Sequence, residues 1–371
     1  MPDPIVNPAA ARQIPIARPS LGAAEAEAAR AAVIEGWISS GPRVEEFERQ
    51  FAAAHGRQYG VACNSGTTAL HLALAALGVG PGDQVLVPTL TMVAVANAVL
   101  YCGARPVLVE SERESGNPDP LWLPRVITPH TKAAIVPHLY GVPAAGFLQA
   151  LRRRCPRLRV IEDCAEAHYA TLAGRPVGSL GRLATFSFYA NKIISTGEGG
   201  LVLTDDERLA QRLRLLRAHA FTPGDHFRHQ SLAYGYRMTD VQAAIGLVQH
   251  GRHEELLRRR AELAQRYIDR LRELRWVGFP ARVAGSVWWV FPLLCPHQAA
   301  RDAVRRALAQ RGVETRSYFR PLHRQAHLRR FATQHYPVAD ELARRGLYLP
   351  LWPGMSDEDV DYVCDGVRAA L

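Results

Sequence analysis

The side chain at position 192 is one of only two lysines in a chain of 371 residues that otherwise uses arginine for its basic groups. It lies in the stretch SFYANKIISTGEGG, between Ser187 and Gly200. A desolvated lysine can lose its proton and form a Schiff base, which a guanidinium cannot do. The other lysine, Lys132, precedes a predicted strand and is typical of an exposed charge. Since a glycine-rich loop that lets backbone approach a ligand follows Lys192, we favour a chemical role for this lysine.

Two further features could serve the same ligand. Asp163 ends the run LRVIED, and open α/β sheets bind ligands beyond the carboxyl ends of their strands, although an aspartate there could also cap a helix. Residues 65–68, SGTT, precede an apolar-periodic helix whose first N–H groups could bind an anion, as could those of any capped helix. An anion cradle, a carboxylate and an amine are what pyridoxal phosphate (PLP) needs for its phosphate, ring nitrogen and aldehyde.

The elements that must position these groups follow an alternating pattern. Six short apolar runs are predicted to be buried strands, at residues 84–88, 105–109, 133–137, 158–163, 184–188 and 200–204. Helical stretches such as TALHLALAALG and AAGFLQALRRR lie between them. Buried strands that alternate with helices predict an α/β fold with a mostly parallel sheet covered on both faces.

The pattern changes near residue 250. An arginine-rich amphipathic helix is predicted over about residues 250–274, followed by a strand at 287–295, a helix at 297–312 and a strand at 313–319. We therefore expect two domains, a large α/β domain over residues 1–249 and a smaller α+β domain over residues 250–371.

Composition excludes several classes of protein. Hydrophobic residues make up 48% and charged residues 22%, with no apolar run long enough to cross a bilayer and no signal-peptide pattern at the start. We expect a cytoplasmic protein with no membrane partner. Six scattered cysteines predict neither a disulfide framework nor a metal site. The net charge of +10 lies largely on helix faces that also carry glutamate, which favours an anionic small substrate over nucleic acid.

With these residues the chain resembles the PLP-dependent sugar aminotransferases of the DegT/DnrJ/StrS type, and within them the GDP-perosamine synthase branch. The resemblance runs from about Pro15 to the end. It is carried by GWISSGP, NSGTTALHLALAALG, VPTLTMVAVANAVLYCGARPV, HLYG, IEDCAEAH, FSFYANKIISTGEGG, YGYRMTDVQAAIG and ETRSYFRPLH. It implies the aspartate-aminotransferase-like fold, PLP fold type I.

The resemblance also implies roles for individual residues. Lys192 would bind PLP as a Schiff base and move protons, and Asp163 would hold the pyridine nitrogen protonated. The other implied cofactor contacts are Gly66, Thr67 and Ser187 at the phosphate, Ala165 on one ring face and Glu166 near the ring hydroxyl. The implied substrate contacts are Trp37, Ser39 and Ser40, His168, and Arg316, Phe319 and His323.

The chain departs from the family pattern at two positions. Met92 stands where relatives stack a Tyr or Phe on the cofactor ring, and a thioether contacts a ring less specifically. Gly235 stands where relatives have an Asn that reaches the phosphate of the neighbouring subunit. Either Arg237 or a backbone N–H would compensate, or the cofactor would be held more loosely.

The function that the resemblance implies is transfer of an amino group from L-glutamate to a nucleotide-linked 3-keto or 4-keto 6-deoxyhexose, by a homodimer with shared active sites. One alternative is an aminotransferase that acts on a keto-cyclitol or another antibiotic precursor. Another is a PLP-binding regulator without catalytic activity. A sugar dehydratase of the same fold is disfavoured, because that branch replaces the lysine by histidine.

Overall fold

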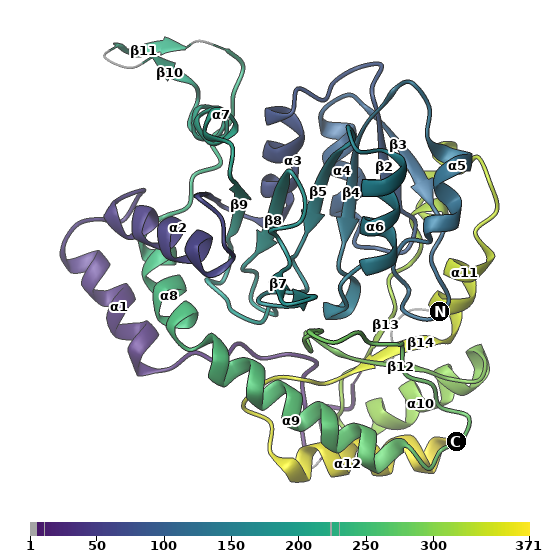
Figure 1. The fold of residues 1–371 in the computed structure, drawn as a ribbon. Coiled ribbons are helices and arrows are strands. Elements are labelled where there is room, and N and C mark those ends of the chain that lie inside the picture. The colour runs from purple at the N-terminus through teal and green to yellow at the C-terminus, as the bar shows by residue number, and fades with distance from the viewer. Residues whose placement is uncertain (1–5, 11, 223–224, 230) are drawn as a thin grey trace.

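A seven-stranded sheet forms the centre of the computed structural model, which describes residues 6–10, 12–222, 225–229 and 231–371 (Figure 1). The strand order is β1-β9-β8-β5-β4-β2-β3. β2 to β5 and β8 run parallel, whereas β9 is antiparallel to both of its neighbours. The strands are β1 (Tyr59–Cys63), β2 (Gln84–Pro88), β3 (Arg105–Val109), β4 (Thr131–Pro137), β5 (Arg159–Asp163), β8 (Leu183–Ser187) and β9 (Gly200–Thr204). The predicted α/β fold with a mostly parallel sheet is confirmed.

Helices cover this sheet, and Figure 1 shows α1 and α2 beside α8 at one side of it. The helices of this part are α1 (Ala23–Ile34), α2 (Pro42–Ala54), α3 (Gly66–Ala76), α4 (Ala94–Tyr101), α5 (Leu123–Val126), α6 (Ala145–Arg154), α7 (Glu207–Arg217) and α8 (Asp240–Gly251). Short 3-10 turns η1 (Pro120–Trp122) and η2 (Leu139–Gly141) and the small strand pairs β6 (Thr171–Leu172) with β7 (Arg175–Pro176) and β10 (Phe221–Thr222) with β11 (Asp225–His229) complete it.

A second, smaller sheet lies below the first in Figure 1, in the antiparallel order β12-β14-β13. The elements of this C-terminal part of the chain are α9 (His253–Leu271), β12 (Phe291–Leu294), α10 (Gln298–Gln310), β13 (Arg316–Ser317), η3 (Leu322–Arg324), η4 (Arg329–Phe331), α11 (Pro337–Arg345), β14 (Gly346–Leu349) and α12 (Asp357–Ala370). Buried residues of α9, the small sheet, α10 and α12 form a second core, which Ile14 joins through a bridge to Val313. The N-terminal stretch therefore packs on the C-terminal part of the chain.

Two predicted elements of this part have different bounds. The helix predicted over residues 250–274 is α9, His253–Leu271, and Arg252, which departs from helical backbone angles, separates it from α8, which ends at Gly251. The strand predicted at 287–295 is confined to Phe291–Leu294. Its first residues leave the small sheet because Val287 N donates to Gly141 O of the large part, at 3.0 Å.

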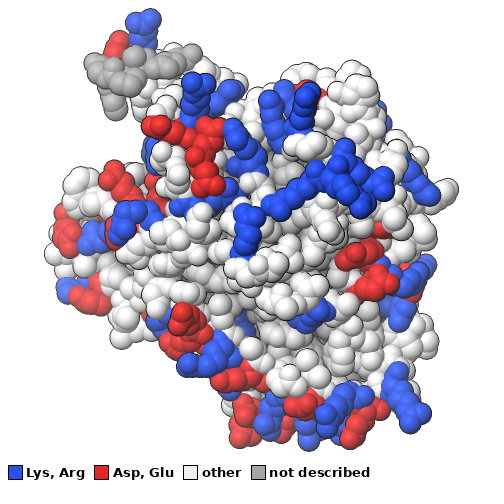
Figure 2. Space-filling view, viewed as in Figure 1, with Lys and Arg blue, Asp and Glu red and all other residues white. Residues whose placement is uncertain are grey.

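Charged side chains follow the helices, as Figure 2 shows over α6, α9 and α12. Arginines of α9 form ion pairs with carboxylates of α12: Arg259 with Asp357, Arg266 with Asp361 and Arg270 with Asp365. Exposed pairs of this kind each contribute about 0–1 kcal/mol to the free energy of unfolding. They therefore add little stability, and their main effect is to align α9 with α12. Among the described residues, no helix is long and apolar enough to cross a membrane.

Candidate active site

A cavity of about 370 Å³ lies where the carboxyl ends of β4, β5 and β8 meet the start of α3. Parallel strands of an open sheet deliver their loops to this edge, which is where such sheets bind ligands. Nine of the residues with a predicted cofactor or substrate role line this cavity: Gly66, Thr67, Met92, Asp163, Ala165, Glu166, Ser187, Lys192 and Phe319. The structure therefore brings three features that are far apart in the sequence into one cavity: the helix start, the strand-end carboxylate and the lysine.

Lys192 reaches this cavity from the loop between β8 and β9. Its backbone N–H donates to Tyr189 O at 2.9 Å, and Thr196 N donates to Phe188 O at 2.9 Å, which closes the loop on itself. Burial lowers the pKa of the Lys192 amine below its ordinary value, while the charges of Glu166 and Asp163 oppose that shift. A buried amine whose pKa is lowered spends more of its time as the nucleophilic free base.

Two buried carboxylates face the amine. Asp163, the last residue of β5, accepts a hydrogen bond from Ala165 N at 3.1 Å, and burial raises its pKa. Glu166 accepts a hydrogen bond from Tyr140 N at 2.8 Å, and burial raises the pKa of Glu166 to about 7. Because Glu166 titrates near neutral pH, it can either accept or donate a proton to a group in the cavity.

Another wall of the cavity is the start of α3. Ser65 caps α3 by accepting a hydrogen bond from Thr68 N at 3.2 Å. The amides of Gly66 and Thr67 belong to the first turn, where N–H groups have no acceptor within the helix. The hydroxyl of Ser187 lies beside them: a Cβ built on Gly66 would be 2.6 Å from the Ser187 Cβ. The close approach of helix and strand thus requires glycine, and it brings amides and a hydroxyl together for an anion.

Some predicted site residues lie outside the cavity of this chain. Trp37, half-exposed, and Ser39, exposed, lie on the turn between α1 and α2, where Ser40 Oγ donates to Met238 O at 2.9 Å. Gly235 lies against the ring of His219. The roles predicted for these positions remain predictions.

Two other predicted contacts, His323 and Arg316, are not among the residues that line the cavity. His323 is buried between Thr89 Oγ1, at 2.7 Å, and the carboxylate of Asp340, at 3.1 Å. Arg316 is exposed and bonds Glu314, and it pairs in the small sheet with Tyr348, which does line the cavity. Arg316 is therefore the cross-strand neighbour of a residue that lines the cavity.

His168 lies in an aromatic cluster deeper in the large part. Its ring lies 5.5 Å from Phe186 and 5.7 Å from Phe188, between ring centroids. Neither ring nitrogen has a hydrogen-bond partner among the described residues, and burial lowers the pKa of His168 well below its ordinary value. This environment holds the imidazole neutral.

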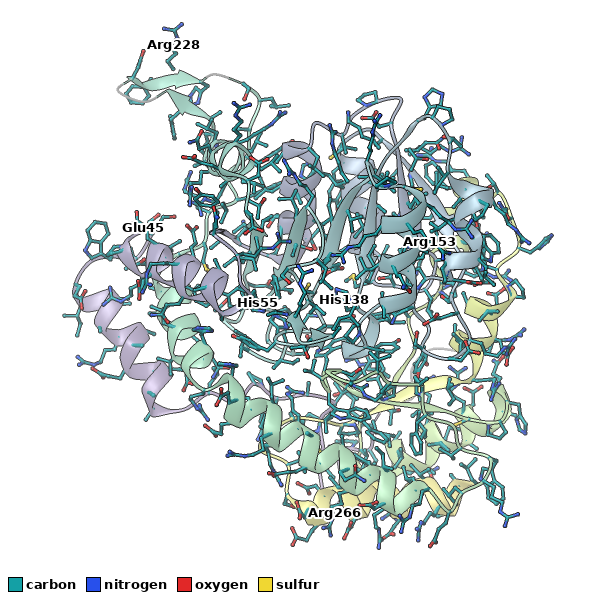
Figure 3. The ribbon with its side chains drawn as sticks, viewed as in Figure 1. Glu45, His55, His138, Arg153, Arg228 and Arg266 are labelled. Carbon is teal, nitrogen blue, oxygen red and sulfur yellow. The ribbon has the colours of Figure 1, made fainter. Side chains whose placement is uncertain are left out.

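The same cluster predicts acid sensitivity through His55, which Figure 3 labels within the large part. Burial lowers the pKa of His55 to about 4. The unfolded chain, with a histidine pKa near 6.5, therefore binds more protons as the pH falls, and the free energy of unfolding is expected to drop by roughly 3 kcal/mol between about pH 6.5 and pH 4. A His55→Phe variant is expected to lose this part of the pH dependence in urea unfolding curves. Equal pH dependence in both proteins would contradict the expectation.

A buried trio close to the cavity has metal-ligand chemistry, formed by His138, Glu162 and Cys164, with His138 labelled in Figure 3. The polar atoms of its His138 and Glu162 are already hydrogen-bonded. Glu162 accepts hydrogen bonds from His138 Nε2 at 3.1 Å and from the backbone N–H groups of Gly178, Leu180 and Gly181. His138 Nδ1 accepts a hydrogen bond from Ala144 N at 3.1 Å. The trio orders the loops after β4 and β5 by hydrogen bonding, which is the structural role that its contacts support.

Sequence reasoning missed residues that come from far along the chain. Trp289, just before β12, and Tyr348 of β14 line the cavity from the C-terminal part of the chain, and Asn191 and His138 line it from the large part. The motif HLYG and the run VWWVF were visible in the sequence, but neither indicated which cavity these side chains would face.

The large sheet, the strand-end carboxylate and the buried lysine define the architecture of PLP fold type I. The chain belongs to the DegT/DnrJ/EryC1/StrS aminotransferase family, whose sequence model matches residues 19–368. Membership confirms the predicted enzyme class, a sugar aminotransferase, and the resemblance from which it was inferred.

Individual relatives span the full chain. A GDP-perosamine synthase of Caulobacter vibrioides is 42% identical over 367 residues, 97% of this chain and 98% of that protein. The aminotransferase TlmJ of Streptoalloteichus hindustanus superposes with a TM-score of 0.91 at 34% identity, over 96% of this chain and 98% of that one. A sugar aminotransferase homologue from Streptococcus pneumoniae, solved in its PLP form, gives a TM-score of 0.91 at 28% identity over 97% of this chain and 100% of that one.

Proposed function

We propose that this enzyme transfers an amino group from L-glutamate to a nucleotide-linked keto-sugar, a GDP-4-keto-6-deoxymannose or a related 3-keto or 4-keto 6-deoxyhexose. The observation that carries the proposal is the Lys192 amine, buried in one cavity with two carboxylates and an anion-binding helix start. Similarity to a GDP-perosamine synthase at 42% identity supports the choice of sugar.

Pyridoxal 5′-phosphate is the cofactor, as predicted: the family is one of aminotransferases, and the Streptococcus pneumoniae homologue was solved in PLP and PMP forms. The residues of this chain fit it. The amides of Gly66 and Thr67 and the hydroxyl of Ser187 suit the phosphate, Asp163 suits the ring nitrogen and Lys192 suits the aldehyde. When bound, the cofactor supplies an electron sink for negative charge on the adjacent substrate carbon.

Each side chain around the cofactor would then have a separate role. Lys192 Nζ would take the proton from the substrate carbon that bears the amino group and return it at the cofactor carbon. Its lowered pKa suits this general acid–base role, because the amine is then more often free to accept a proton. The Asp163 carboxylate would keep the ring nitrogen protonated through a charge-assisted hydrogen bond. Glu166, whose pKa is about 7, would exchange a proton with the ring hydroxyl. Ala165 would pack on one face of the ring.

The amino donor and the diphosphate are anionic, and arginine is the usual partner of such groups in proteins. Among the described residues that line the cavity, none is an arginine. We propose that a second copy of the chain completes the site as a homodimer. The turn between α1 and α2 supports this, because it exposes Trp37 by 51% and Ile38 by 60%, and Ile34 beside it by 68%. Light scattering on the purified protein should give twice the mass of one chain, and a monomer that retains full activity would contradict the proposal.

Gly66 provides a test of the phosphate site. In a Gly66→Ala variant the new Cβ would overlap Ser187, so helix and strand must separate and the anion site must open. The dissociation constant of pyridoxal phosphate is expected to rise at least about tenfold, a loss of about 1.4 kcal/mol. Titration of the apoprotein, followed by absorbance, measures it. Gly80→Ala is the matched control, since a Cβ at Gly80 meets nothing within 4 Å. Equal affinities in both variants would show that the phosphate binds elsewhere.

The substrate is tested by a panel of nucleotide keto-sugars. The panel varies the nucleotide and the position of the keto group, glutamate serves as donor, and products are read by mass and by NMR. A gain of an amino group on a 4-keto or 3-keto 6-deoxyhexose is the expected result. Amination of a keto-cyclitol alone would replace the proposed substrate, and absence of amination with every acceptor would refute the proposal.

A further inference from the structure

Trp289 contacts the loop that carries Lys192 in two ways. Its indole Nε1–H donates to Asn191 O at 2.9 Å, so it binds the peptide just before the lysine. The ring face lies over Lys192 Nζ, 4.1 Å from the ring centroid. A side chain from the small part of the molecule therefore contacts both the backbone and the amine of one catalytic segment.

The position of Trp289 is itself fixed. The buried Arg260 of α9 donates to Trp289 O and to Leu351 O, both at 2.9 Å. Val287, two residues earlier, is joined to Gly141 of the large part by a backbone hydrogen bond. Only 3% of Trp289 is exposed. The backbone around Trp289 is therefore held by hydrogen bonds on both sides, which fixes the buried indole against the lysine loop.

The plane of the ring is fixed as well. Trp289 stacks near-parallel with Tyr140, at an interplanar angle of 17°, and with Phe319, at 16°. These aromatic neighbours present one face of the indole to the cavity. An ammonium over the face of tryptophan is attracted by the ring quadrupole, and the attraction grows when water is excluded.

We propose that Trp289 is a positioning residue for Lys192: its N–H fixes the peptide that precedes the lysine, and its ring face holds the protonated amine. This inference rests on the proposed function. The titratable groups that act on the amine are Asp163, Glu166 and His168, all from β5 or the segment that follows it. The indole comes from the C-terminal part of the chain, and so adds an attraction that the carboxylates do not supply.

Two substitutions separate the two contacts. Trp289→Phe removes the N–H donor and keeps an aromatic face, whereas Trp289→Leu removes both. Trp288→Leu is the matched control, because Trp288 packs on Phe291 and Arg282 and is not among the residues that line the cavity. The probe is pyridoxal 5′-phosphate, added to the full-length apoprotein. Its aldehyde carbon bonds the lysine nitrogen, and the aldehyde oxygen leaves as water.

The rate of this condensation is measured as a function of pH by absorbance, and its location by borohydride reduction and peptide mapping. Trp289→Phe is expected to slow the reaction about fivefold to tenfold, the effect of one lost hydrogen bond. Trp289→Leu is expected to lower the maximal rate of the condensation by a similar factor. It is also expected to move the pH of half-maximal rate down by about one unit, because without the ring the amine loses its proton at lower pH. Trp288→Leu should match the parent protein in both respects.

The outcomes separate two kinds of failure. Parent-like rates and pH midpoints in both Trp289 variants would overturn the proposal for Trp289. If Trp289→Leu does not fold, the rate of Trp289→Phe decides alone. A parent protein that forms no bond at Lys192 would instead overturn the proposed function.

Discussion

Replacing Lys192 by alanine is expected to lower kcat/KM for amino transfer by about ten-thousand-fold or more. The substitution removes both a nucleophile and the group that moves protons at the substrate carbon, and acid–base catalysis by one positioned side chain alone contributes about 10²–10⁴-fold. Steady-state rates with glutamate and the best acceptor of the keto-sugar panel measure the loss.

The control for this result is the other lysine. Lys132 forms a partly exposed ion pair with Asp83 at 2.8 Å and lies outside the cavity, so Lys132→Ala should change the rate by less than about twofold. Equal losses in the two variants would indicate that overall charge or stability, rather than the cavity amine, determines activity.

Replacing Asp163 by asparagine is expected to lower kcat by roughly hundredfold to thousandfold while leaving the fold intact. Asparagine keeps the shape of the side chain and can still accept from Ala165 N, but it cannot pair as an anion with a protonated ring nitrogen. Losing a charge-assisted hydrogen bond of that kind corresponds to about 3–4 kcal/mol in a water-poor site.

The matched control for Asp163 is Asp83→Asn, which removes the surface partner of Lys132. Single-turnover rates with prebound cofactor separate loss of chemistry from loss of cofactor affinity. Unchanged single-turnover rates in Asp163→Asn would mean that the ring nitrogen does not need a carboxylate, and would remove Asp163 from the mechanism.

The parts of the site that the sequence predicted are those with local signals. Asp163 follows a run of buried apolar residues, Ser65 begins an apolar-periodic helix, and Lys192 precedes a glycine-rich loop. Each signal fixes one residue on one element. The parallel sheet then brings these ends together, because strands β4, β5 and β8 all finish at the same edge.

The parts that local signals could not predict depend on contacts between distant segments. The run VWWVF has the composition of a strand, yet the bond from Val287 to Gly141 turns its start toward the large part and places Trp289 over Lys192. His168 lies two residues after Glu166 in the sequence, but it packs among Phe51, Phe186 and Phe188 instead of lining the cavity. Side-chain direction after a strand end is set by packing, which a single sequence does not display.

The bounds of the long helix are a second feature that local sequence signals did not predict. Apolar periodicity continues through residues 250–274, so the pattern predicted one helix. Gly251 ends α8, and the break at Arg252 lets Arg252 bond Glu25 of α1, at 2.9 Å. The break between α8 and α9 therefore coincides with a contact to the N-terminal part of the chain.

The most direct measurement is the location of the cofactor. The purified protein, saturated with pyridoxal 5′-phosphate, is reduced with borohydride, digested, and its peptides are mapped by mass. A single pyridoxyl group on the peptide that contains Lys192, absent when glutamate is added before the reductant, is the result that our account predicts. A label on Lys132 or on the N-terminal amine, with Lys192 unmodified, would contradict it.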